Sequence, residues 1–173
     1  MTTAYLAPIA WYREYLALAD ATIDSSESYV KQTNRNRCTI AMPDGPANLI
    51  VPVEGTSKHL PIREIRISEH GNWRHHHWNA IRTAYGKSPF FEFYADEFAP
   101  FYERRNHDYL LDFNMALHNV VCQLIDMEQT VAPNQQRQEP YYQVFASRLG
   151  FLSGLSVIDL LFNMGPESIF YLK

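Results

Sequence analysis

The sequence is poor in the residue patterns that reveal a function directly. Its two cysteines, Cys38 and Cys122, lie far apart, so neither has a second cysteine at metal-ligand spacing. This argues against a zinc knuckle and gives a disulfide no support, so we expect two reduced, buried thiols. Basic runs are also lacking, because none exceeds the pair Arg104-Arg105, and 15 basic against 19 acidic side chains give a net charge of −4. Nucleic-acid binding needs a concentrated positive face, so the sequence argues against such a partner.

Long apolar runs and targeting signals are missing as well. No segment approaches the roughly 18 apolar residues of a membrane span, and no basic start followed by an apolar stretch opens the chain. We therefore expect no membrane span and a cytoplasmic location. With 46% hydrophobic residues and only 7 glycines and 10 prolines among 173 residues, the composition excludes collagen, coiled coil and disorder. We expect one domain over residues 1–173, whereas the composition leaves the oligomeric state open.

The first part of the chain predicts a β-α-β unit. The segments Ala4–Leu6 and Thr22–Asp24 are each interpreted as a short strand, and Pro8 stands where a helix between them would begin. If the two strands are parallel, the loops that follow them emerge at the same edge of the sheet, where open α/β sheets bind ligands. That edge would carry Tyr5, Asp24, Glu27, Lys31, Gln32 and Arg35.

Further strands are expected before residue 70. The turn signal Pro43-Asp44-Gly45-Pro46 lies between Cys38–Met42 and Asn48–Val53, which predicts a hairpin. Alternating isoleucines over Ile62–Ile67 predict a half-exposed strand. We therefore expect an α/β fold with a small mixed sheet and helices packed on it.

The second half is predicted to be mainly helical. Apolar spacing, caps and stop signals predict helices over 72–86, from 88 to a kink or end at Pro100, over 108–125, from 156 and from 166. The polar stretch 126–139 is predicted to be an exposed connection, and 141–145 a strand. Asn114 and His118 fall on the apolar side of the third helix, so each is either a satisfied core residue or lines a cavity.

The polar run from Glu27 to Arg37 is the first candidate for chemistry. Arg35 or Arg37 could hold a phosphate or carboxylate in a bidentate fork, while Gln32 could read hydroxyls or amides. The alternative is a solvated loop whose arginines pair with the acidic excess. No phosphate loop, dinucleotide fingerprint, nucleophile elbow or zinc-protease helix is present.

His77 is the second candidate, because it falls in the middle of the apolar arc of the helix over 72–86. A neutral imidazole there could act as a general base, but a core histidine bonded to the backbone is an equal alternative. His75 points the opposite way, so the triplet His75-His76-His77 cannot offer three ligands to one metal. Asp159 is most simply explained as part of a capping box with Ser156, and Glu167 as a negative charge at the positive N-terminal end of the last helix.

The chain resembles the shorter branch of the WbqC-like family, and the matching motifs occur in order along nearly its whole length. Asn34 departs from the pattern, because an aromatic residue is expected there. The matching motifs are Tyr5-Leu6-Ala7-Pro8, Lys31 to Cys38, Val51-Pro52-Val53, Trp73 with His77-Trp78, Tyr85-Gly86, Ser88 to Tyr94, Leu155 to Asn163, and Gly165 to Ser168.

The resemblance implies a role in building bacterial surface polysaccharide of the O-antigen or capsule type. Our hypothesis is a transferase that acts on a nucleotide-linked or lipid-linked sugar, for example by acylating an amino sugar. In this hypothesis His77 is the general base, and the sugar precursor contacts Tyr5, Glu27, Lys31, Gln32, Arg35, Arg37 and Asn114. The alternative is a non-catalytic protein that binds a glycan precursor or assembles enzymes of the same pathway. The resemblance names no cofactor.

Overall fold

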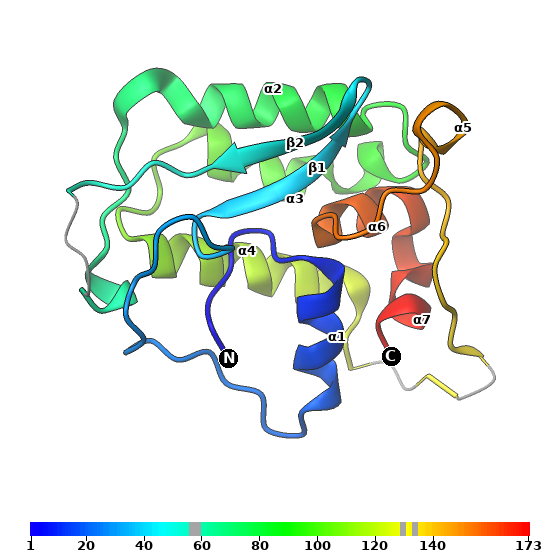
Figure 1. Cartoon of the computed structure of the whole chain (residues 1–173), viewed down its shortest axis with the longest axis horizontal. Coiled ribbons are helices and arrows are strands. Elements are labelled where there is room, and N and C mark those ends of the chain that lie inside the picture. The colour runs from blue at the N-terminus through cyan, green and yellow to red at the C-terminus, as the bar shows by residue number, and fades with distance from the viewer. Residues whose placement is uncertain (56–59, 129–130, 133–134) are drawn as a thin grey trace.

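The sheet of this protein is a single antiparallel hairpin. A computed structural model describes residues 1–55, 60–128, 131–132 and 135–173 (Figure 1), and within them the sheet consists of β1 (Arg37–Met42) and β2 (Gly45–Ile50). Arg37 pairs with Ile50 at one end and Met42 with Gly45 at the other. Gly45 has a φ of 126°, which a side chain would disfavour. The predicted hairpin is therefore confirmed, with its second strand three residues earlier than the predicted Asn48–Val53.

Helices make up most of the remaining structure, as expected for an α/β chain with a mainly helical second half. In Figure 1 the hairpin lies alongside α2, and α4 runs across the middle of the molecule, above α1. The helices are α1 (Ile9–Ala17), α2 (Trp73–Tyr85), α3 (Phe91–Glu103), α4 (Leu110–Ile125), α5 (Ala146–Leu149), α6 (Val157–Met164) and α7 (Ile169–Leu172), with 3₁₀ turns at Ile62–Glu64, His70–Asn72 and Gly165–Ser168.

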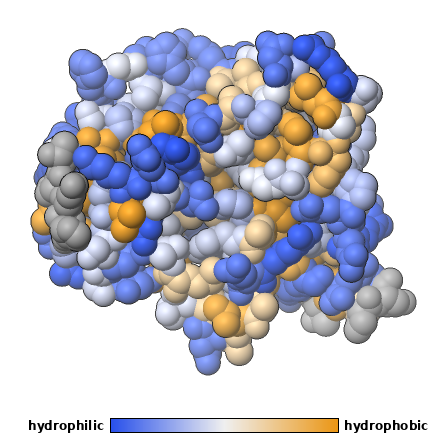
Figure 2. All heavy atoms as spheres, in the orientation of Figure 1, coloured by the Kyte–Doolittle hydropathy of each residue, from blue (hydrophilic) through white to orange (hydrophobic). Residues whose placement is uncertain are grey.

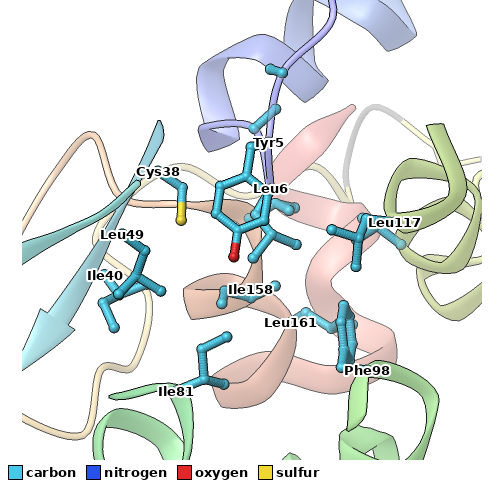
Figure 3. Packing of buried hydrophobic residues seen from close by; sticks show 14 of the residues in the cluster. Tyr5, Leu6, Cys38, Ile40, Leu49, Ile81, Phe98, Leu117, Ile158 and Leu161 are labelled. Atoms are coloured by element: carbon cyan, nitrogen blue, oxygen red, sulfur yellow. The ribbon is translucent and has the colours of Figure 1, made fainter. Parts of the chain in front are cut away.

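The core is built around α6. Residues 157–163 are all buried, and five of these seven residues are apolar, as a helix enclosed by the core requires. Figure 3 shows Ile158 and Leu161 of this helix beneath Tyr5 and Leu6, with Ile40 and other hairpin residues to one side. The first residues of the chain therefore enter the middle of the molecule instead of its edge.

The predicted β-α-β unit is wrong. Residues Ala4–Leu6 form a buried irregular segment, and Thr22–Asp24 belong to no strand. The backbone N–H of Tyr5 donates to the carbonyl of Asn34 at 2.8 Å, so this segment pairs with a loop. Three apolar residues are too few for periodicity to separate a strand from irregular buried chain.

Other local predictions need smaller corrections. Ile62–Ile67 begins with a 3₁₀ turn and otherwise makes isolated bridges, and 141–145 is no strand. Helix α3 continues through Pro100 to Glu103. Ser156 accepts a bond from the N–H of Ile158 as its cap, whereas the Asp159 carboxylate turns away into the core. Part of the predicted connection, 129–130 and 133–134, lies outside the described residues.

Candidate functional site

The loop between α1 and β1 folds back on itself through short polar contacts. The Asp24 carboxylate accepts bonds from the backbone N–H of Ser26, at 2.8 Å, and from its hydroxyl. Thr33 donates its hydroxyl to the carbonyl of Val30, and Gln32 adopts a left-handed conformation with a φ of 59°. Polar side chains of this kind stabilise turns by bonding to nearby backbone. The fold of the loop brings Glu27 and Arg35 together.

Glu27 and Arg35 form an ion pair that is largely withdrawn from water. The Arg35 Nη2 atom donates to Glu27 Oε2 at 2.5 Å, and the two side chains are 14% and 10% exposed. The other carboxylate oxygen, Oε1, accepts the backbone N–H of Thr3 at 2.8 Å. A pair this buried must be well bonded to offset its loss of hydration. The charge of Arg35 is therefore neutralised by Glu27.

Asn114 of α4 forms hydrogen bonds to the loop at Arg35 and to Thr3. Its Nδ2 atom donates to the backbone carbonyl of Arg35 at 2.7 Å and to the hydroxyl of Thr3 at 3.4 Å. Asn114 is only 1% exposed, as its predicted position on the apolar side of the helix implies. We call Glu27, Arg35, Arg37 and Asn114, together with the Tyr29 beside them, the loop cluster.

The loop cluster holds buried polar atoms without partners. Arg35 Nε, Arg37 Nε and Asn114 Oδ1 are screened from water and have no hydrogen bond within the described residues. Arg37 forms no ion pair with any described residue. Burial raises the pKa of the Tyr29 phenol, and the nearby charges of Arg37 and Arg35 oppose that rise. Native proteins leave few buried polar atoms unsatisfied, so each of these points to an unfilled contact.

Lys31 and Gln32 lie at the exposed surface of the same loop. Their side chains are free to reach a ligand that approaches the loop from solvent. Together, the loop cluster and these two residues account for most of the predicted binding residues.

Tyr5 and His77 form a separate group in the core. The Tyr5 hydroxyl lies 3.0 Å from His77 Nδ1 and 2.8 Å from the Tyr102 hydroxyl, and Tyr5 is fully buried. Burial lowers the pKa of His77 to about 4, against a smaller opposing effect of its hydrogen bond to the backbone of Ile50. His77 is therefore neutral near pH 7 and bonded on both sides. This is the arrangement of a core histidine, and the general-base role stays a prediction.

The described residues contain no group of three histidine, cysteine or acidic side chains that could hold a metal ion. As predicted, His75 lies on the exposed side of α2 while His77 is buried, and His76 is exposed as well. Both thiols are free. Burial raises the pKa of the Cys38 thiol well above its usual value and that of the partly buried Cys122 to about 12, so both are protonated.

Comparison of the sequence with known proteins identifies the family of this chain. The model of the WbqC-like protein family matches residues 4–136. The chain belongs to this family. That match includes every residue of the loop cluster as well as Tyr5 and His77. A Mycobacterium tuberculosis protein named Uncharacterized protein Rv1507c is 30% identical over 127 residues, which are 72% of this chain and 54% of the relative.

The WbqC-like chain thus spans about half the length of the curated relative it matches. No solved structure is significantly similar to it. Within the part of the chain that the structure describes, no helix is both long and apolar enough to cross a membrane.

Three contributors to these groups were not predicted from the sequence. Thr3 binds Glu27 through its backbone N–H, which carries no residue-specific signal. Tyr29 lies inside the polar run but was not singled out. Tyr102 was not singled out either, although a buried tyrosine hydroxyl regularly has a polar partner.

Proposed function

We propose that this WbqC-like protein acts in the biosynthesis of bacterial surface polysaccharide, where it binds an anionic nucleotide-linked or lipid-linked sugar at the loop cluster. The observation that carries the proposal is the set of buried, unpartnered groups on Arg35, Arg37 and Asn114. They lie inside the region that defines the family. A ligand that satisfied them would gain charge-assisted hydrogen bonds that the free protein lacks.

Within this proposal the two arginines have different roles. Arg35 is neutralised by Glu27, so it positions the loop and its backbone. Arg37 has no carboxylate partner among the described residues and supplies the charge for a phosphate or carboxylate group. Lys31 and Gln32 at the loop surface would contact the outer part of the ligand.

The reaction we propose is group transfer, in which an acyl group is added to an amino sugar. A transferase of this type needs a base to take a proton from the acceptor amine or hydroxyl. His77 has the neutral form that a base requires, but Tyr5 and the Ile50 backbone occupy its ring nitrogens. The second candidate function, a non-catalytic binding or assembly protein of the same pathway, is favoured by this burial.

A thermal-shift screen against nucleotide sugars, nucleotides, free sugars and acyl-coenzyme A species tests the binding site. A ligand at 100 times its dissociation constant should stabilise the fold by about 2.7 kcal/mol, which is roughly 5–10 °C for a chain of this size. Arg37→Gln should remove the shift. The matched control is Arg63→Gln, because Arg63 is an exposed arginine outside the loop cluster. A flat response to every compound would contradict the proposal.

Replacement of His77 separates the two functions. In a transferase with His77 as the base, His77→Gln lowers turnover by about 10²–10⁴-fold while ligand binding and folding survive. In the non-catalytic alternative, the ligand binds without turnover and binding is indifferent to the same substitution.

A further inference from the structure

A second surface feature lies away from the loop cluster. A groove of about 310 Å³ is lined by Pro89, Phe90, Tyr142, Asn163, Met164 and Glu167. It lies beyond the C-terminal end of α2, near the hairpin turn, whereas Arg37 begins β1 at the far end of the hairpin. Figure 2 shows hydrophobic residues, in orange, interspersed among hydrophilic ones on the face of the molecule that Figure 1 presents. The groove is therefore independent of the loop cluster.

The groove is unusually aromatic for a surface. Tyr142 is 56% exposed, and Phe93, whose ring centre lies 6.2 Å from that of Phe90, is 75% exposed. Burying rings of this size would stabilise the fold, so their exposure calls for an explanation. Aromatic faces at a surface suit a ligand that has one apolar side.

The floor of the groove is fixed before any ligand arrives. The Phe90 backbone N–H donates to the carbonyl of Phe162 at 3.0 Å. Gly165 has a φ of 55°, and a Cβ atom there would come within 2.4 Å of the Phe90 ring. Only glycine permits this close approach, which holds the ring in place. A preformed aromatic floor lowers the entropic cost of binding.

Two residues of the groove lining, Asn163 and Glu167, carry side-chain oxygens that accept hydrogen bonds. Asn163 is 3% exposed, and it donates Nδ2 to the carbonyl of Asp159 at 2.7 Å. Its Oδ1 atom has no partner among the described residues. Glu167 adds an exposed carboxylate, which also binds Arg137. Met164 lines the groove beside Asn163, and its flexible thioether side chain can adapt its packing to a ligand.

We propose that this groove binds a pyranose ring. An apolar sugar face would stack on Tyr142 and the phenylalanines, while ring hydroxyls would donate to Asn163 Oδ1 and Glu167. Two acceptors and no unpaired cation in the lining favour a neutral sugar over a phosphate. The inference extends the proposed function, because it adds a site for the acceptor glycan beside the anion site at Arg37.

Saturation-transfer NMR with methyl β-glycosides of glucose and N-acetylglucosamine tests this site. We expect saturation of the ring protons in the wild-type protein and at least a roughly tenfold loss of affinity in Tyr142→Ala and Phe93→Ala. Ile50→Ala and Val30→Ala are the matched controls, because both remove an exposed hydrophobic side chain elsewhere and should leave binding unchanged. Tyr142 of the groove and Phe93, which lies beside the groove residue Phe90, are both exposed, so their variants should fold.

Three results would overturn the proposal. The first is the absence of saturation transfer to either glycoside at millimolar concentration, and the second is equal binding by Tyr142→Ala. The third is a dimer that Phe93→Ala converts to a monomer in light scattering, because a second copy would then cover the groove. Arg37→Gln should leave glycoside binding intact while removing the shift with a nucleotide sugar, so a failure of one site is distinguishable from a failure of the other.

Discussion

Two buried polar clusters in this protein differ in whether their hydrogen bonds are complete. Around Asp159, the Tyr141 hydroxyl donates to the carboxylate at 2.6 Å and Gln143 Nε2 at 3.0 Å. Gln143 Oε1 in turn accepts the backbone N–H of Leu152 at 2.9 Å. In the loop cluster, by contrast, donors on both arginines and the Asn114 oxygen have no partner within the described residues.

This difference separates a structural network from a candidate binding site. Asp159 connects α6 to the segment before α5 through these hydrogen bonds. Among the described residues, no side-chain atom of Asp159, Tyr141 or Gln143 is buried without a partner. A complete network stabilises the fold and leaves nothing for a ligand. The loop cluster carries the opposite signature, because its free groups lower stability unless something binds them.

The largest expected effect is on the complete network. Asp159→Ala leaves the donors of Tyr141 and Gln143 buried without an acceptor, so we expect a loss of about 3–4 kcal/mol in the free energy of unfolding. Urea denaturation measures it. Asp159→Asn is the control, because its amide oxygen still accepts a bond and the loss should be smaller. A loss in Asp159→Ala below about 1 kcal/mol would remove the contrast between the clusters.

The same carboxyl predicts a pH dependence. Burial raises the pKa of Asp159 to about 6, although hydrogen bonds from Tyr141, Tyr85 and Gln143 oppose the rise. The unfolded pKa is about 3.9, so between these values the folded state binds more protons than the unfolded state. This group's contribution to stability is therefore full below about pH 4 and is lost as pH rises to about 6, by about 3 kcal/mol at most.

Measuring the free energy of unfolding of the wild type and of Asp159→Asn between about pH 4 and 6 isolates the contribution of the Asp159 carboxyl. The stability difference, wild type minus variant, should fall as pH rises. A flat difference would show that the carboxyl titrates normally. His77 has the opposite slope, because its pKa is lowered to about 4 and stability is lost as pH falls from about 6.5.

A smaller loss is expected at the ion pair of the loop cluster. Arg35→Gln leaves the Glu27 carboxylate largely buried beside the N–H of Thr3 alone, which should cost about 2 kcal/mol. Because the pair is coupled, the double variant with Glu27→Gln should be less destabilised than the sum of the single variants. Thermal unfolding of the wild type, the two single variants and the double variant gives the coupling energy of the pair as a double-mutant cycle. Additive losses would mean that the pair contributes no coupling.

The smallest effect on stability is expected at Arg37. Arg37→Gln breaks no ion pair with a described residue, so its free energy of unfolding should stay within about 0.5 kcal/mol of the wild type. The same variant should lose the stabilisation by ligand that the wild type shows. Calorimetric unfolding with and without ligand measures both quantities. A large loss of intrinsic stability would place Arg37 among the structural residues and break the comparison.

Local signals predicted much of the secondary structure. The turn Pro43-Asp44-Gly45-Pro46 predicted the hairpin, and helical spacing predicted α2 and α4 with Asn114 and His118 on the buried side. The strands expected at Ala4–Leu6 and Thr22–Asp24 failed, because such short runs carry too little pattern. The polar run from Glu27 to Arg37 was recognised as a candidate site. The sequence did not show that Arg35 pairs with Glu27 while Arg37 has no ion-pair partner among the described residues.

By itself, the sequence determined the hairpin, the main helices and the family, because turn chemistry and periodicity act over a few residues and the motifs can be read in order. Only the tertiary structure decided which polar groups are paired. Asn114 and Thr3 are 111 positions apart, yet they meet beneath the loop. Arg35 is neutralised and Arg37 is not, although the two differ by two positions. Contacts of this kind depend on how the core brings distant segments together, which no local pattern records.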